Sequence, residues 1–195
     1  MVKGTHQAID DVRNETVKIF INGEFHDRRE AKISVFDSGY LVGDGVWEAF
    51  RVHQGKLIFI DQHLDRLWQS AKVIGIDIPF SKEELINNVH RTLKINGMKN
   101  DVHVRAMLTR GIKKTPSQDP RLTISGPNLV IIAEFKAAAE ESKTQGISLF
   151  TSTIRRGAPD YLDPRLNCHS KLHEVQALIQ AIEAGADEAL MLDVN

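Results

Sequence analysis

One arginine stands where its surroundings would suit a phosphate group. Arg66 belongs to residues 37–71, which are expected to form a glycine-rich loop, a pair of strands and an amphipathic helix. The helix is expected over residues 63–74, with Arg66 near its first turn and opposite the apolar face. A guanidinium beside free backbone N–H groups and the positive end of a helix dipole favours phosphate binding. The alternative is an exposed arginine on a solvated helix face.

A second pair of polar residues lies on the predicted strand 102–110. Four apolar residues alternate there with His103, Arg105, Met107 and Thr109, which is the pattern of a half-exposed strand. His103 and Arg105 are two residues apart and therefore project to the same side. An arginine in that position can receive a ligand carboxylate through two parallel hydrogen bonds. The alternative is a strand face that is simply exposed to solvent.

The strands that must position these residues are short and separated by turn signals. Two dipeptides, Asn22-Gly23 and Gln54-Gly55, predict tight turns between neighbouring strands. Alternating or continuous apolar character predicts strands at residues 16–22, 46–52, 56–60, 102–110 and 129–135.

Glycines and a capping signal predict the remaining local structure of this region. Gly39, Gly43 and Gly45 indicate a loop whose backbone uses positive φ angles. Ser81 and Glu84 form a capping box, which predicts the start of a second helix that ends near Gly97.

The order of the elements predicts an α/β (α+β) fold in two parts. We expect an N-terminal α/β domain at residues 1–136, in which a sheet is flanked by two helices, and a linker at residues 137–145. A second domain is expected to begin at residue 146 and to run to residue 195. It is expected to contain a strand at 147–154, an amphipathic helix at 172–182 and a strand at 187–193.

Composition excludes several classes of protein. The chain has 195 residues, 42% hydrophobic composition and a net charge of −1, so it can form a sizeable core but has no field that would recruit nucleic acid. It has no run of about 18 apolar residues and no leader-like N-terminus, so neither a membrane span nor secretion is expected. The single cysteine, Cys168, favours a reducing compartment, and a cytoplasmic location is predicted.

Residues 43–71, GDGVWEAFRVHQGKLIFIDQHLDRLWQSA, resemble the start of the class-IV (fold-type IV) aminotransferases, which use pyridoxal phosphate. This family includes branched-chain amino acid aminotransferases, D-amino acid aminotransferases and aminodeoxychorismate lyases. The match is strong at GDGV-aromatic-Glu and at HLDRL followed by a small residue, and weaker similarity runs from Val17 to the last residue. The resemblance implies that Arg66 binds the cofactor phosphate and that Trp47 lines the substrate pocket. His103 and Arg105 match an aromatic-x-Arg pair of branched-chain aminotransferases, with histidine replacing tyrosine, which leaves the amino acid specificity open.

The family also implies a lysine at the strand-to-helix transition after Pro164, which forms a Schiff base with the cofactor and moves the Cα proton. Counting back from Gly185 places the family's lysine position at Asn167, and asparagine cannot form a Schiff base. The nearest lysine is Lys171, about one helical turn farther along. Either the loop is re-registered and Lys171 is the catalytic lysine, or the protein lacks a Schiff-base lysine and Lys171 is a solvated residue of the first helical turn.

The resemblance implies pyridoxal-phosphate-dependent transfer of an amino group between a branched-chain-like amino acid and 2-oxoglutarate. Two alternatives remain open: an aminodeoxychorismate-lyase-like β-elimination, and a catalytically silent relative. The family continues beyond Asn195 with further cofactor contacts, so the second domain is expected to be incomplete in this chain. Family members are commonly homodimers, and a homodimer is expected here.

No metal or nucleic-acid site is expected. His169 and His173 have a spacing that can bind a metal on a helix, but no third ligand is indicated. The basic residues Lys113, Lys114 and Arg121 lack interleaved aromatic residues, which favours a solvated loop over nucleic-acid contact.

Overall fold

A computed structural model describes residues 10–137 and 140–194 of the chain. Residues 1–9 of the predicted N-terminal domain, residues 138–139 of the predicted linker and Asn195 lie outside the described residues. Backbone contacts divide the chain into two compact units. The sheet unit consists of Asp11–Lys136 and Asn167–Ser170, and the second unit contains Ala137–Leu166 and Lys171–Asn195. The proposed domain boundaries themselves stay a prediction.

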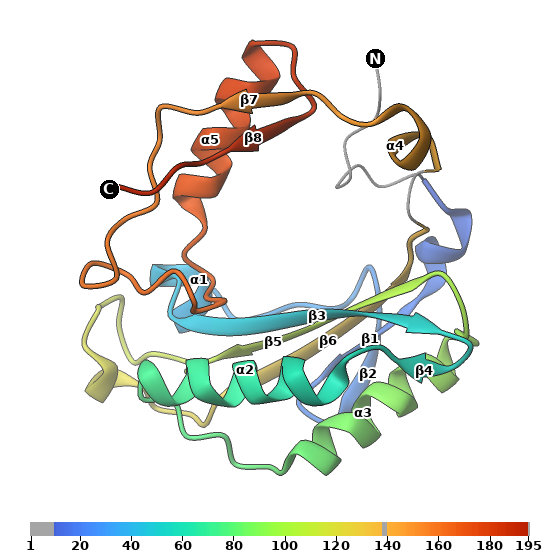
Figure 1. Cartoon of the computed structure of the whole chain (residues 1–195). Helices are drawn as coiled ribbons and strands as arrows, with labels where there is room; N and C mark the ends of the chain where they lie inside the picture. The colour runs from blue at the N-terminus through green and yellow to red at the C-terminus, as the bar shows by residue number, and fades with distance from the viewer. Residues whose placement is uncertain (1–9, 138–139, 195) are drawn as a thin grey trace. The chain divides into compact units, whose positions relative to one another are not determined.

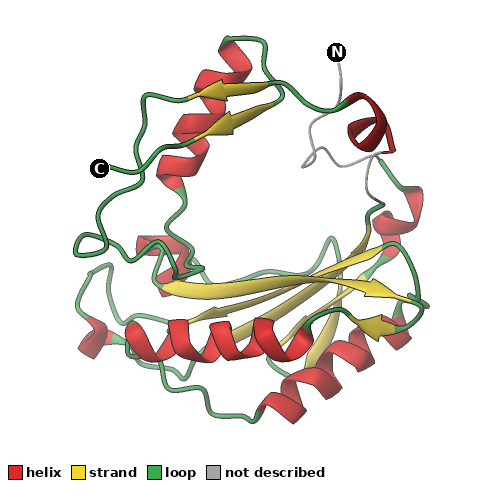
Figure 2. Cartoon of the chain, viewed as in Figure 1, coloured by secondary structure: helices red, strands yellow, loops and turns green. Residues whose placement is uncertain are grey.

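The sheet unit is built on six antiparallel strands in the order β2-β1-β6-β5-β3-β4 (Figure 1). Apolar side chains at every second position favour strands. In β5, for example, every second residue is buried against the helices. The mixture of helices and strands confirms the predicted α/β class (Figure 2). The strands are β1 (Lys18–Ile21), β2 (Glu24–Asp27), β3 (Gly45–His53), β4 (Lys56–Leu57), β5 (Val102–Thr109) and β6 (Asn128–Phe135).

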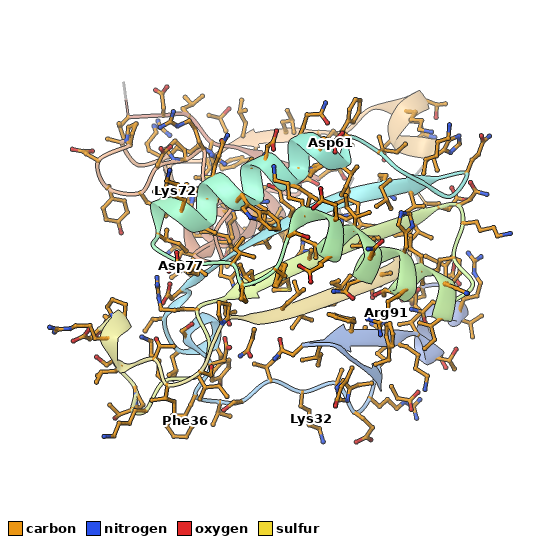
Figure 3. The ribbon with its side chains drawn as sticks, turned by 90° about the horizontal axis from the view of Figure 1, so that it is seen from below. Lys32, Phe36, Asp61, Lys72, Asp77 and Arg91 are labelled. Atoms are coloured by element: carbon orange, nitrogen blue, oxygen red, sulfur yellow. The ribbon has the colours of Figure 1, made fainter. Side chains whose placement is uncertain are left out.

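Helices α2 (Ile60–Val73) and α3 (Lys82–Ile95) cover one face of this sheet (Figures 1 and 3). Leu64 and Leu67 of α2 and Leu85 and Val89 of α3 are buried in the core beneath them. Such burial of apolar side chains is the main stabilising term for a helix packed on a sheet. Two short 3-10 helices, Val12–Thr16 and Pro120–Leu122, complete the unit.

The second predicted helix begins as expected. Ser81 Oγ accepts a hydrogen bond from the Glu84 backbone N–H at 3.1 Å, and the Glu84 carboxylate accepts one from the Ser81 N–H at 2.7 Å. The first helix differs, because it starts at Ile60 and not at residue 63. The strand predicted over residues 56–60 is correspondingly reduced to two residues, since Phe59 turns the chain with a φ of 53°.

The predicted glycine loop is partly wrong, because Ser38–Val42 form a short helix, α1. Asp37 caps this helix by accepting a hydrogen bond from the Gly39 N–H at 2.8 Å. Gly43 ends it with a φ of 70°, as a left-handed residue at a helix C-terminus commonly does.

Gly39 and Gly45 are required for close packing and do not use positive φ. A Cβ atom at Gly39 would lie 2.5 Å from Thr109 Cγ2, and one at Gly45 would lie 2.7 Å from the Leu108 carbonyl oxygen. Both distances are far below van der Waals contact, so the chain before β3 can approach β5 only without side chains at these positions.

The second unit contains a parallel pair of strands, β7 (Leu149–Thr151) and β8 (Glu188–Leu190), and helix α5 (Leu172–Glu183). Both strands are shorter than predicted. Ala177 and Ala181 are the buried residues of α5, while several residues of its predicted apolar face, including Val175 and Ile179, are exposed. Helix α4 (Glu140–Gln145) lies within the segment predicted as a linker. No helix in the described ranges is long and apolar enough to cross a membrane.

Arg110 joins three elements of the sheet unit just after β5. Its Nε and Nη2 donate to the two carboxylate oxygens of Asp44 at 2.6 and 2.9 Å. Its Nη1 and Nη2 also donate to the carbonyl oxygens of Gly75 and Ile74, at the end of α2, at 2.7 and 2.6 Å. The side chains of Arg110 and Asp44 are only 16% and 17% exposed, so solvent screens this pair weakly.

We predict that Arg110→Lys lowers the free energy of unfolding by about 1–3 kcal/mol, because lysine keeps the charge but loses the planar fork. Chemical denaturation followed by circular dichroism measures the change. Arg121→Lys is the matched control, since Arg121 makes the same two-point pair with Asp119 but is 87% exposed. That control should change stability by less than about 0.5 kcal/mol. Equal losses in both variants would contradict the role assigned to Arg110.

Candidate functional site

A cavity of about 690 Å³ lies on the face of the sheet away from α2 and α3. Its walls come from alternate residues of β1, β5 and β6, from the segment before β3, and from His169. The aliphatic part of the wall includes Ile19, Ile21, Val130 and Ile132. A concave, mostly apolar space with a few polar groups is the usual form of a small-molecule site.

Arg105 supplies an unpaired positive charge to this cavity. As predicted, it projects to the same side of β5 as His103, and both line the cavity. Its guanidinium carbon lies 4.2 Å from the ring centroid of Trp47 on the neighbouring strand β3. Burial lowers the pKa of Arg105, against the opposing effect of the Glu134 carboxylate. Among the described residues the guanidinium has no hydrogen-bond or ion-pair partner, so it is free to receive an anion.

His103 adds a neutral group beside that charge. Burial, together with the positive charges of Lys136, Arg51 and Arg105, lowers the pKa of His103 to about 4. The imidazole is therefore uncharged near neutral pH, where it can donate one hydrogen bond and accept another.

Asp37 places a buried carboxylate in the wall of the cavity. Its carboxylate accepts hydrogen bonds from the Gly39 N–H, the Thr109 hydroxyl and the Asn128 amide at 2.8, 2.7 and 2.6 Å. These three donors fix the carboxylate within the protein. His169 also lines the cavity, and burial lowers its pKa. Its Nε2 is buried and has no hydrogen-bond partner in the described part of the chain.

The position predicted to hold a lysine in the family, Asn167, lies along the free edge of β3. The Trp47 N–H donates to the Asn167 carbonyl at 2.9 Å, and the indole N–H of Trp47 donates to the Cys168 carbonyl at 3.0 Å. The His169 N–H donates to the Gly45 carbonyl at 2.9 Å. These three bonds hold the segment beside β3, and none of them uses the side chain at position 167.

Arg66 lies on the other side of β3, where it binds a buried acid. It donates through Nε and Nη2 to both carboxylate oxygens of Glu48, the second at 2.7 Å, and His63 Nδ1 lies 2.7 Å from Glu48 Oε2. The Glu48 side chain is 0% exposed and that of Arg66 is 49% exposed. Arg66 is not among the residues that line the cavity.

The predicted contribution of the α2 N-terminus to phosphate binding is wrong. Arg66 is the seventh residue of α2, about 9 Å along the axis from Ile60, so the free N–H groups of the first turn lie elsewhere. The group of α2 that is available for phosphate binding is therefore the guanidinium of Arg66 itself. It has five N–H donors, of which Glu48 takes two on one edge, so the Nη1–Nη2 edge can still bind two phosphate oxygens. The arrangement therefore fits a phosphate group.

Sequence reasoning did not find Glu48. A usable signal existed, because the alternation in β3 places Glu48 on the same buried face as Val46 and Phe50. A carboxylate on such a face requires a charged or hydrogen-bonding partner.

Lys171 lies in the second unit, where it is the residue before α5. Its Nζ donates to the Glu174 carboxylate at 3.0 Å, and the same carboxylate accepts from Arg156 at 3.2 Å. The three side chains line a small cavity with Glu188. In the described ranges, no group of three or more histidine, cysteine, aspartate or glutamate side chains is arranged to hold a metal ion.

Comparisons with known proteins show the family to which the chain is related. A family model described as amino-transferase class IV matches residues 45–195. The chain is 37% identical over 180 residues to branched-chain-amino-acid aminotransferase-like protein 1 of Arabidopsis thaliana, an alignment that covers 92% of this chain and 32% of that protein.

Solved structures show the same fold. The branched-chain aminotransferase of the thermophilic archaeon Thermoproteus uzoniensis, solved with norvaline, is 27% identical, with a TM-score of 0.78 over 92% of this chain and 60% of that one. The 4-amino-4-deoxychorismate lyase of Pseudomonas aeruginosa is 26% identical, with a TM-score of 0.71 over 90% of this chain and 61% of that one. The chain thus spans from about a third to three fifths of the length of these proteins.

We predict that His103 makes the protein less stable in mild acid. Its native pKa of about 4 is below the value of about 6.5 expected in the unfolded chain, so the unfolded chain takes up the proton first. Stability is therefore kept above about pH 6.5 and falls between about pH 6.5 and 4. We expect a loss on the order of 1 kcal/mol, because partial solvent exposure reduces the effect.

The test compares the wild type with His103→Gln in denaturant titrations at several pH values. The variant should lose less stability between pH 6.5 and 4, and NMR of the wild type should show the His103 imidazole titrating near pH 4. Parallel pH profiles for the two proteins would contradict the prediction.

Proposed function

The chain belongs to the class-IV aminotransferase family, and we propose that it forms part of a pyridoxal-5'-phosphate-dependent enzyme. This enzyme transfers an amino group between a branched-chain-like amino acid and 2-oxoglutarate. The observation that carries the proposal is the unpaired guanidinium of Arg105 at a cavity with an aliphatic part to its wall, because every amino acid and 2-oxo acid presents a carboxylate.

Three residues of the sheet unit form the proposed substrate site. Arg105 binds a substrate carboxylate bidentately, and the ring of Trp47 against it limits the orientations that the guanidinium can take. His103, as a neutral imidazole, adds a hydrogen bond without adding charge. The isoleucine and valine side chains of the cavity wall suit an aliphatic substrate side chain, because contact between them removes apolar surface from water.

The cofactor is held in this proposal through its phosphate. Arg66 offers the edge of its guanidinium that Glu48 leaves free. When bound, pyridoxal phosphate supplies the electron sink that stabilises negative charge at the substrate Cα. One structurally similar branched-chain amino acid aminotransferase was solved with pyridoxamine 5'-phosphate, which supports the choice of cofactor.

Lys171 is the proposed catalytic lysine, because position 167, where the family resemblance implies a lysine, carries an asparagine. Its amine would bind the cofactor covalently and carry the proton to and from the substrate Cα. For this it must leave Glu174 and give up a proton, because only a neutral amine has a lone pair for attack. Arg156 also donates to Glu174, so the carboxylate keeps a partner when Lys171 moves away.

Two other functions have specific observations in their favour. The structural similarity to a 4-amino-4-deoxychorismate lyase favours a β-elimination with the same cofactor. Asn167 favours a catalytically silent relative that keeps phosphate binding through Arg66. In either case we propose a homodimer, as the family resemblance implies, and a cytoplasmic location, to which the single cysteine is suited.

We predict that pyridoxal phosphate gives the full-length protein a visible absorption band that Lys171→Ala abolishes. The band reports the covalent bond between the cofactor and a lysine. Lys72→Ala is the control, because Lys72 is an exposed residue near the end of α2 (Figure 3), and its band should match that of the wild type. A band that survives Lys171→Ala would assign the bond to another lysine. No band in any of the proteins would favour the silent relative.

We also predict that Arg105→Gln raises KM for the amino acid and the 2-oxo acid by about 10- to 100-fold, because a charged two-point contact is lost. Cofactor affinity should change little, since Arg105 and Arg66 lie on opposite sides of the sheet. Steady-state kinetics and cofactor titration measure the two effects. Arg91→Gln on α3, on the helix-covered face in Figure 3, is the control and should leave both unchanged.

A further inference from the structure

We propose that Glu48 is a positioning residue: it holds the guanidinium of Arg66 so that its Nη1–Nη2 edge faces a phosphate group. The inference rests on the proposed function, in which Arg66 binds the cofactor phosphate. Glu48, on strand β3, acts on the phosphate only through Arg66, on helix α2.

The surroundings of Glu48 show that its carboxylate needs these contacts. Its side chain is 0% exposed and lies on the core face of β3, between Val46 and Phe50 and opposite Ala106 of β5. A carboxylate in such a place loses its hydration, which is costly unless ionic and hydrogen-bonding partners replace it. Those partners, Arg66 and His63, both come from α2.

The contacts select one edge of the guanidinium. Glu48 Oε1 accepts from Arg66 Nε, and Oε2 accepts from Nη2 at 2.7 Å. This two-point pairing fixes the plane of the guanidinium and leaves both N–H groups of Nη1 and one of Nη2 for a second anion. A free arginine side chain would have to lose its rotational freedom on binding, and a side chain that is already fixed loses less.

His63 holds the carboxylate itself in place. Because a carboxylate only accepts, His63 Nδ1–H donates to Glu48 Oε2 across 2.7 Å. The imidazole packs near Phe50, with ring centroids 5.8 Å apart, which restrains His63 itself. Glu48 is thus fixed from two positions on α2, one turn apart.

Positioning and simple electrostatics predict opposite results. A buried negative charge next to Arg66 weakens the attraction of that site for a phosphate, so removing the charge should tighten phosphate binding if charge alone mattered. If Glu48 acts by orienting Arg66, removing its charge should weaken phosphate binding. The sign of the change therefore separates the two explanations.

The test measures how much the protein prefers pyridoxal phosphate to pyridoxal, using quenching of tryptophan fluorescence in the full-length protein. The ratio of the two dissociation constants isolates the phosphate contribution, which a general loss of structure would not change selectively. We expect Glu48→Gln to lower this preference by about tenfold, as loss of a supporting partner commonly does. Arg66→Lys should lower it at least as much, and the double variant should show no further loss.

A preference that stays the same or rises in Glu48→Gln, while Arg66→Lys lowers it, would overturn the inference and leave the role of Arg66 intact. A preference that Arg66→Lys does not change would overturn the proposed phosphate contact, and the inference with it. If circular dichroism shows that Glu48→Gln does not fold, Glu48→Asp takes its place. That variant keeps the charge but retracts the carboxylate by about 1.5 Å, and the same fall in preference is expected.

Discussion

The antiparallel register between β3 and β5 decides on which side of the sheet each functional side chain stands. Trp47 pairs with Met107 and Glu48 pairs with Ala106, so neighbouring residues of one strand face opposite environments. The Trp47 ring lies against the guanidinium of Arg105, which lines the cavity, and Glu48 is buried in the core beneath α2. A shift of one residue in this register would reverse both assignments, because side chains alternate with a period of two.

Three arginines of the sheet unit have different electrostatic surroundings. Arg66 and Arg110 are each held by a carboxylate through two hydrogen bonds, which fixes their orientation. Arg105 has an aromatic ring as its neighbour and no acid bound to it among the described residues. A desolvated guanidinium of this kind keeps its charge for a ligand, whereas the paired guanidinium of Arg110 joins elements of the fold.

The side chain of Asn167, the position predicted for the family's lysine, takes no part in the backbone bonds that hold its segment. The chain there is bound to β3 through the carbonyl oxygens of Asn167 and Cys168 and the N–H of His169. None of these bonds uses the side chain at 167. An asparagine at this predicted lysine position is therefore compatible with an intact sheet unit, whether the catalytic lysine lies elsewhere or the protein is a silent relative.

The sequence by itself determined the family, the α/β class, the capping box at Ser81 and the common side of His103 and Arg105, because these depend on short-range periodicity and motifs. The tertiary structure alone decided that Arg66 binds Glu48, which is 18 residues away. It also decided that Gly39 and Gly45 are needed for close packing against β5. Both features join segments that are separate in the sequence, and only the pairing of β3 with β5 and the packing of α2 bring those segments together.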